Sequence, residues 1–194
     1  RFLPGSQVLS TMLSTAYKIG QSISAIEHSS PVSAQNFEPI ATVVMFSVNK
    51  EPSTLVLSTQ AAPVSSALQN AGINEIIVNT GQHYDFNMSD IFINELNISK
   101  PNYNLNVGSN THAKQTSDII CKLEEIILNI KPRAVLVYGD TNSTLGGAIA
   151  VSKLDIPLIH IEAGLRSFNK AMPEEINRVI TDHISNVFFG PSNI

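Results

Sequence analysis

The sequence predicts a doubly wound α/β domain, a Rossmann-like parallel sheet with helices on both faces, over residues 58–194. From about residue 58, segments with apolar residues at helical spacing alternate with short apolar segments. The short segments are unbroken apolar runs, which is typical of parallel strands buried on both faces. Small residues gather within 141–154, and they would let that helix lie close to the sheet.

The helices and strands of this domain follow in regular order. Gly72 is suited to cap the first helix, and Lys131-Pro132 ends a helix whose apolar residues recur at helical spacing. The runs EIIV, AVLV and PLIHI are the clearest strands. The predicted helices are 62–70, 86–96, 114–129, 141–154 and 173–185, and the predicted strands are 75–78, 134–137, 157–161 and 187–189.

Residues 1–57 differ from the rest in composition. They are rich in Ser, Thr and Pro, show weak periodicity and carry no recognisable motif. Segments 43–48 and 54–57 are candidate strands. We therefore expect 1–57 to be a lead-in that is disordered or foreign to the domain, and 58–194 to be the domain itself.

Composition excludes several classes of function for this chain of 194 residues. Charged residues make up 14%, against ~25% in typical domains. Twelve basic and sixteen acidic residues give a net charge of −4, which argues against binding nucleic acid or anionic membranes. The lone Cys121, expected to be buried on a helix, excludes an internal disulfide and a multi-cysteine zinc site. With no export signal and no apolar run near the ~20 residues of a membrane span, a soluble cytoplasmic protein is expected.

Polar residues follow three of the predicted strands. Gln82 and His83 come after the first, Asp140 after the second, and Glu162 and Arg166 after the third. Ligands of open parallel sheets bind beyond the carboxyl ends of the strands, so these side chains are candidates for a site.

Each candidate also has a structural explanation. Asp140-Thr141 could cap the following helix, and Arg166 could be the ion-pair partner of Glu162. A carboxylate at the start of the helix at 173–185 favours the helix dipole, which accounts for Glu175 but leaves Glu174 open as a functional residue. His160 lies within a strand and is expected to be a hydrogen-bonded core histidine.

Familiar cofactor and nucleophile motifs are absent from the sequence. There is no G-x-G-x-x-G, no phosphate loop, no G-x-S-x-G elbow and no close pair of histidines. We therefore expect no cofactor and no metal site. What remains is a set of carboxylates at strand ends, which is suited to proton transfer.

Four ordered segments carry a family resemblance. Together with APVSSAL at 62–68, they resemble the non-hydrolysing UDP-N-acetylglucosamine 2-epimerases over residues 61–194. The segments are TGQHYD (80–85), VYGDTNSTL (137–145), HIEAGLRS (160–167) and MPEEINRVITDH (172–183).

This resemblance implies a glycosyltransferase-B type fold, in which the active site lies between two Rossmann-like domains. It implies an isomerase of cell-surface polysaccharide biosynthesis that interconverts UDP-GlcNAc and UDP-ManNAc by eliminating and re-adding UDP through 2-acetamidoglucal. It also implies a homodimer and no redox cofactor. The residues implied as catalytic are Asp140, Glu162 and Glu174, and those implied as substrate-binding are Gln82, His83, Arg166 and Arg178.

The sequence also departs from the family pattern. Leu55 and Gln60 stand where family members carry an Arg and a Lys that face the nucleotide sugar, and no counterpart of the second domain follows residue 194. Neither residue offsets the charge of a diphosphate. We therefore expect an N-terminal domain with negligible turnover by itself. Three alternatives stay open: a related epimerase acting on another UDP-amino sugar such as a UDP-2,3-diacetamido sugar acid, a hydrolysing epimerase, and a degenerate non-catalytic fragment.

Overall fold

The computed structural model of the 194-residue chain describes residues 39–44, 52–81 and 100–190. Within these ranges, no helix is long and apolar enough to cross a membrane. The helices are α2 (Pro52–Asn70), α4 (His112–Ile130), α5 (Asn142–Val151) and α6 (Pro173–Ile184). The strands are β1 (Ile40–Val44), β2 (Glu75–Asn79), β3 (Tyr103–Asn104), β4 (Ala134–Tyr138), β5 (Leu158–Ile161) and β6 (Val187–Phe189).

The described strands form one parallel sheet of order β3-β2-β1-β4-β5-β6. β1 lies at the centre, where Ile40 is in register with Glu75 of β2 and Ala134 of β4. This is the strand order of a Rossmann fold, in which the chain first adds strands on one side of β1 and then on the other side. The predicted doubly wound α/β class is confirmed.

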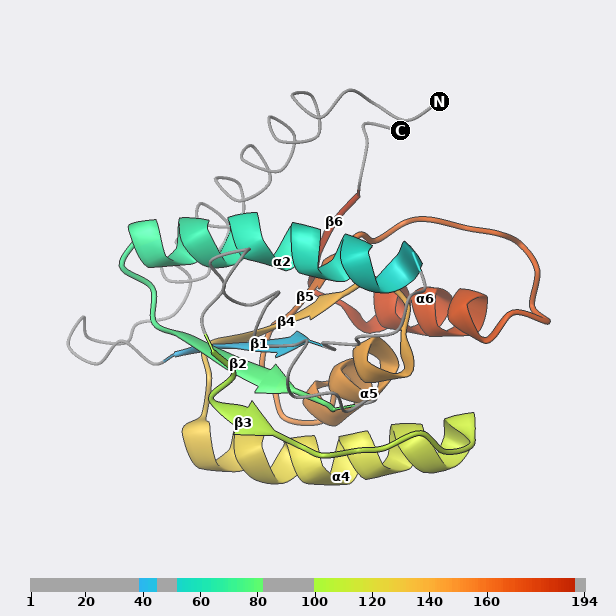
Figure 1. Ribbon diagram of the computed structural model, residues 1–194, viewed down its shortest axis with the longest axis horizontal. Helices are drawn as coiled ribbons and strands as arrows, with labels where there is room; N and C mark the ends of the chain where they lie inside the picture. Colours follow the sequence, from blue (N-terminus) through green and yellow to red (C-terminus); the bar gives the residue numbers. More distant parts are fainter. Residues whose placement is uncertain (1–38, 45–51, 82–99, 191–194) are drawn as a thin grey trace.

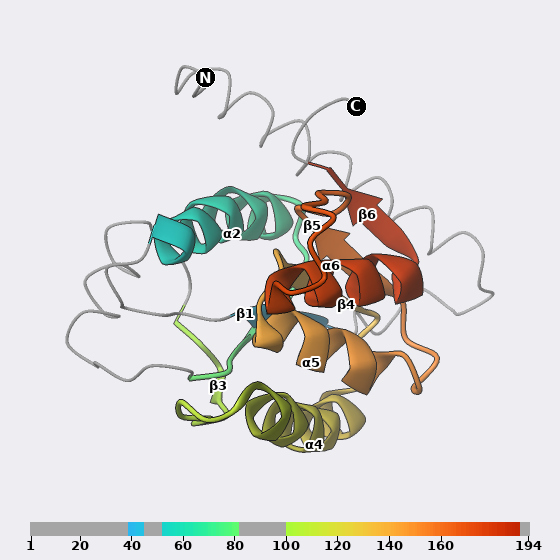
Figure 2. The same cartoon turned by 90° about the vertical axis from the view of Figure 1, so that its right-hand side faces the viewer.

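Helices cover both faces of the sheet, with α2 on one side and α4 and α5 on the other (Figure 1). α5 contacts both α4 and α6, which complete that second layer (Figure 2). Side chains along β4 alternate between the two cores: Leu136 packs with Leu68 of α2, and Val137 packs with Leu123 of α4. All five residues of β4 are buried, which explains why its sequence is an unbroken apolar run.

Two positions in the fold require glycine. Gly72 has a φ of +71° directly after α2, and the amides of Gly72 and Ile73 donate to the carbonyls of Gln69 and Leu68, as in a Schellman cap. The predicted cap is confirmed. In α5, a Cβ on Gly146 would lie 2.7 Å from Cγ2 of Ile119, so the glycine permits the close approach of α4.

The early part of the chain differs from the sequence prediction. The candidate strand 54–57 lies inside α2, and the strand expected at 43–48 is found at Ile40–Val44. The sheet thus includes residues before position 58, and α2 crosses the expected boundary between 57 and 58. The central place of this strand was not predicted, because it depends on pairing with β2 and β4.

Smaller differences follow from local sequence. β3 has two residues, too few to give a strand signal. The helix expected at 86–96 lies outside the described residues. Cys121 is exposed, contrary to the expectation of a buried side chain, because it falls on the solvent side of α4 between the core positions Ile119 and Leu123.

Candidate functional site

The carboxyl edge of the sheet collects the predicted candidates that the structure describes. Because β4 and β5 are parallel neighbours, Asp140 and Glu162 follow strand ends on the same edge. Glu174 lies in the first turn of α6, whose Asn177 donates to the main-chain oxygen of Asp140 at 2.9 Å. The structure therefore brings Asp140 close to the helix that carries Glu174.

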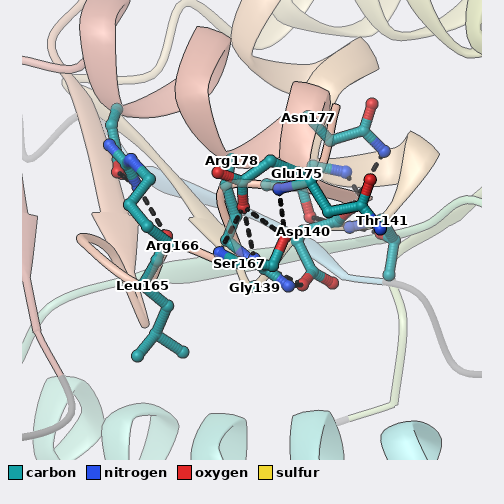
Figure 3. A network of polar contacts seen from close by, with 12 residues as sticks. Gly139, Asp140, Thr141, Leu165, Arg166, Ser167, Glu175, Asn177 and Arg178 are labelled. Atoms are coloured by element: carbon teal, nitrogen blue, oxygen red, sulfur yellow. Dashed lines mark hydrogen bonds and ion pairs between the residues drawn. The ribbon is translucent and has the colours of Figure 1, made fainter. Parts of the chain in front are cut away.

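Asp140 is paired with Arg178 of α6. Nε of Arg178 donates to Oδ2 of Asp140 at 2.8 Å, and Nη2 lies 2.7 Å from the same oxygen. Nη1 of Arg178 lies 2.9 Å from Oε2 of Glu175, so one guanidinium links two carboxylates (Figure 3). Such charge-assisted bonds are about twice as strong as neutral ones and fix the direction of the carboxylate.

Thr141, rather than Asp140, caps the following helix. Its hydroxyl accepts from the amide of Thr144, and the hydroxyl of Thr144 accepts from the amide of Thr141, which completes a capping box. The carboxylate of Asp140 is thus not used as the helix cap. Its side chain is 31% exposed, which leaves it accessible at the sheet edge.

Glu175 anchors the segment between β5 and α6. Its carboxylate accepts from the amide and hydroxyl of Ser167 and from the amide of Phe168, at 2.8, 3.0 and 3.1 Å. These bonds, led by the Ser167 amide, together with the charge of Arg178, hold the pKa of Glu175 below its usual value. Glu175 is 3% exposed. Glu175 is therefore a buried structural carboxylate. The sequence indicated only a favourable interaction with the helix dipole, whereas the structure shows that Glu175 also holds the segment before α6.

Glu162 and Glu174 are both half-buried but differ in their surroundings. Glu162 has a φ of +70°, a conformation that is uncommon outside glycine and that concentrates at functional sites. Glu174 makes no hydrogen bond or ion pair with other residues in the part of the chain that the structure describes. A carboxylate that is half-buried and unpaired is free to exchange a proton with a ligand.

The predicted binding residues have carboxylate partners or lie outside the described ranges. Arg166 pairs with Asp182 at 2.6 Å, and Arg178 pairs with Asp140 and Glu175. The other two predicted binding residues, Gln82 and His83, lie outside the described ranges. Among described residues, no group of three or more His, Cys, Asp and Glu side chains is placed to hold a metal ion.

His160 has the structural role that its place in a strand predicted. It is fully buried, and its ring nitrogens lie 2.6 Å from Oδ1 of Asp182 and 2.7 Å from the main-chain oxygen of Gly139. Sequence reasoning did not find Asp182 or Asn177. Both lie on α6, and their partners are 16 to 37 positions away in the chain, so only the fold reveals the contacts.

Comparison with known proteins gives consistent matches for most of the chain. A family model described as UDP-N-acetylglucosamine 2-epimerase matches residues 66–194. A Methanococcus maripaludis protein named a UDP-N-acetylglucosamine 2-epimerase homolog is 60% identical over 131 residues, which cover 68% of this chain and 36% of the relative. The UDP-2,3-diacetamido-2,3-dideoxy-D-glucuronate 2-epimerase of Pseudomonas aeruginosa is 53% identical over 136 residues, which cover 70% of this chain and 38% of that enzyme.

Solved structures give the same result. The crystal structure of the Methanocaldococcus jannaschii UDP-GlcNAc 2-epimerase with UDP-GlcNAc and UDP matches at a TM-score of 0.71 and 44% identity, covering 79% of this chain and 40% of that chain. The Neisseria meningitidis enzyme bound to UDP-GlcNAc matches at a TM-score of 0.69 and 32% identity, covering 79% of this chain and 40% of that one. The chain thus spans between 36% and 40% of the length of these proteins.

Proposed function

The chain belongs to the UDP-N-acetylglucosamine 2-epimerase family, and from this premise we propose that its carboxylates invert C2 of UDP-N-acetylglucosamine to give UDP-N-acetylmannosamine. The strongest support is the edge of the sheet, where Asp140 and Glu162 follow neighbouring strands and Glu174 lies on the helix bound to Asp140. Because the chain spans less than two fifths of the M. maripaludis relative, the proposal concerns what these residues contribute to the reaction.

The proposed reaction removes the C2 proton and expels UDP. The C2–H bond and the bond from C1 to the UDP oxygen break, a C1–C2 double bond forms, and the intermediate is 2-acetamidoglucal. UDP then adds back at C1 while a proton enters C2 from the opposite face. Inversion needs a proton acceptor on one face of C2 and a proton donor on the other, so at least two acid–base groups are required.

We assign the proton transfers to Asp140 and Glu174 and place Glu162 against the sugar. Asp140 is a carboxylate oriented by Arg178, as a base needs to be when it abstracts a proton from carbon. Glu174 has no partner to displace among the described residues, so it can take up or release a proton at little structural cost. The proposal assigns neither residue to a particular face of C2.

Arginines are proposed to contact the UDP group. A guanidinium offsets the charge of a diphosphate and binds its oxygens in pairs. Arg166 and Arg178 lie at the sheet edge, each held by a carboxylate, and both are proposed to contact the nucleotide sugar together with Gln82 and His83. The reaction is internal to the sugar nucleotide and is proposed to need no cofactor.

A second substrate is supported by one observation. The P. aeruginosa relative named for UDP-2,3-diacetamido-2,3-dideoxy-D-glucuronate is 53% identical, and the M. jannaschii relative named for UDP-N-acetylglucosamine is 51% identical. Both names describe inversion at C2. The alternative is therefore the same chemistry on a sugar that differs at C3 and C6.

The intact protein is further proposed to be a homodimer. The outer side of α6 exposes Ile176, Val179 and Ile180, at 45%, 44% and 37%, a contiguous apolar face on an otherwise amphipathic helix. Light scattering on the purified 194-residue chain measures its mass. A dimer mass is expected, and a monomer mass at the highest concentration tested would contradict this assembly for the present domain.

The substrate proposal is tested by conversion assays on the chain and on a chimera. In the chimera, residues 61–190 replace the matching segment of the M. jannaschii enzyme, which supplies the remainder of a solved structure. Each protein is incubated separately with UDP-N-acetylglucosamine and with UDP-2,3-diacetamidoglucuronate, and the products are separated by chromatography.

The expected result is conversion of UDP-N-acetylglucosamine by the chimera and negligible conversion by the 194-residue chain. Preferential conversion of the diacetamido uronate supports the alternative substrate. Release of free N-acetylmannosamine would indicate a hydrolysing enzyme. A folded chimera that converts neither substrate, while the parent M. jannaschii enzyme remains active, contradicts the proposal.

A further inference from the structure

Three successive main-chain carbonyls lead from β4 into the site, and each accepts a hydrogen bond from a different element. Tyr138 O accepts from the hydroxyl of Thr144 in α5 at 2.5 Å, and Gly139 O lies 2.7 Å from Nε2 of His160 in β5. Asp140 O accepts from Nδ2 of Asn177 in α6 at 2.9 Å. The main chain that leads into Asp140 is therefore held by hydrogen bonds from three different elements.

Among these donors, His160 contacts an oxygen atom with each of its two ring nitrogens. A carbonyl only accepts, so Nε2 carries a proton toward Gly139. Nδ1 lies 2.6 Å from Oδ1 of Asp182, whose Oδ2 accepts from the amide of Gly164 at 3.0 Å and pairs with Arg166 at 2.6 Å. The two oxygens of Asp182 thus contact three groups that belong to β5 or to the segment after it.

Asp182 therefore reaches two segments at once. Through His160 it is connected to Gly139, the residue before Asp140, and directly it holds Gly164 and Arg166, which follow Glu162. Glu162 has a φ of +70°, which is strained for a residue other than glycine, so the backbone after β5 is in a conformation that needs outside support. His160 is fully buried and the Asp182 side chain is 12% exposed, so water competes little for these bonds.

From this arrangement we propose that His160 and Asp182 are positioning residues that fix Asp140 and Glu162 relative to each other. His160 holds the segment after β4, Asp182 holds the segment after β5, and the bond between them joins the two. The catalytic meaning of this placement rests on the proposed function, whereas the coupling of the two segments stands on the hydrogen bonds alone. Neither residue is proposed to touch the reacting sugar.

The first test detects the hydrogen bond from His160 to Gly139 by nitrogen NMR of the labelled 194-residue chain. A protonated Nε2 whose proton exchanges slowly is expected, and its signal should vanish in His160→Gln. An Nε2 without a proton, or with a proton that exchanges as fast as that of the exposed His183, contradicts the proposal.

The second test separates the two halves of the connection. The amide of His160→Asn reaches Asp182 but not Gly139, whereas the longer amide of His160→Gln reaches Gly139 but not Asp182. Hydrogen exchange at the Gly139 amide should therefore speed up by up to about tenfold in His160→Asn, the effect of losing one hydrogen bond, while Gly164 is unchanged. His160→Gln should show the reverse, and the control His183→Asn should show neither.

A purely structural histidine gives another result: both variants lower the thermal midpoint and speed exchange at Gly139 and Gly164 equally. That outcome overturns the proposal. Turnover of the chimera supplies the catalytic readout, where His160→Asn and His160→Gln should both lower kcat with KM unchanged, because each breaks the connection between the two segments. Unchanged kcat in folded His160→Asn contradicts the positioning role. If the wild-type chimera is inactive but the NMR and exchange results hold, the proposed function fails and the coupling stands.

Discussion

The two faces of the sheet are built differently. On the α4–α5–α6 side, the buried polar residues Gln115, Asn142 and Asn177 bond to one another or to the backbone of Asp140. On the α2 side, the core is apolar around Tyr138, whose buried hydroxyl has no partner in the described part of the chain. Buried polar groups are costly unless they are paired, and here the paired ones lie where they orient the candidate carboxylates. One face supports the fold and the other also supports the site.

The largest effect is expected for Asp140→Asn in the chimera. The amide keeps the shape of the side chain but cannot accept the C2 proton, so kcat should fall by about 10²–10⁴-fold, the usual contribution of a general base. Asp118→Asn on the exposed face of α4 is the matched control, because Asp118 pairs with Lys114 at the surface. Equal turnover of the two variants would remove Asp140 from the mechanism.

The next effect concerns the α2 face alone. Leu68→Ala removes a side chain that is 2% exposed and packs against β4 and β5, and it should cost about 2–5 kcal/mol of the free energy of unfolding. Denaturant unfolding measures this cost. Turnover of the chimera per folded molecule should be unchanged, since α2 contributes no described bond to the candidate carboxylates. A loss of turnover larger than the loss of folded protein would break the distinction between the faces.

The site face should have a pH-dependent contribution from Glu175. Hydrogen bonds from Ser167 and Phe168 and the charge of Arg178 lower the pKa of Glu175 in the folded state. The stabilisation is therefore complete above the usual pKa of glutamate and is lost as pH falls through the lowered value. The difference in unfolding free energy between wild type and Glu175→Gln should be largest at neutral pH and shrink in acid. A difference that does not vary with pH would contradict this cause.

The smallest effect on stability is expected when a buried hydroxyl is removed, and its direction should differ between the two faces. Burial, with the negative charge of Glu75, raises the pKa of Tyr138 well above its usual value, and its hydroxyl is unpaired among described residues. Tyr138→Phe should therefore be neutral or slightly stabilising. Thr144→Val removes a hydroxyl that bonds Tyr138 O and the Thr141 cap, and should cost about 1 kcal/mol. Thermal unfolding of both variants compares them, and a destabilised Tyr138→Phe would show that its hydroxyl has a partner.

The sequence predicted the parts of this molecule that depend on local pattern. Buried strands such as β4 and β5 are continuous apolar runs, and α4 has regular helical spacing, so their order predicted the parallel sheet. Asp140 and Glu162 were also predictable, because each directly follows an apolar strand and ligands bind at the carboxyl ends of such strands. β1 escaped recognition as the central strand, because its role depends on pairing with β2 and β4 rather than on its own residues.

The contacts within the site could not be predicted in the same way. The bond of Arg178 to Asp140 spans 38 positions, and that of His160 to Asp182 spans 22. Glu175 is adjacent to Glu174 in sequence, yet one is buried with four polar contacts and the other is half-buried with none described. Neighbouring residues of a helix face different directions, so only the position of α6 against the sheet distinguishes them.

Glu174 offers the most direct test of the central claim that these carboxylates move the C2 proton. The chimera is incubated with UDP-N-acetylglucosamine in deuterated water, and deuterium at C2 is measured by NMR for wild type and Glu174→Gln. We predict incorporation by wild type and a loss of about 10²–10⁴-fold in the variant, with the unfolding free energy unchanged. Incorporation at the wild-type rate in the folded variant would contradict the assignment of Glu174 as a proton-transfer residue.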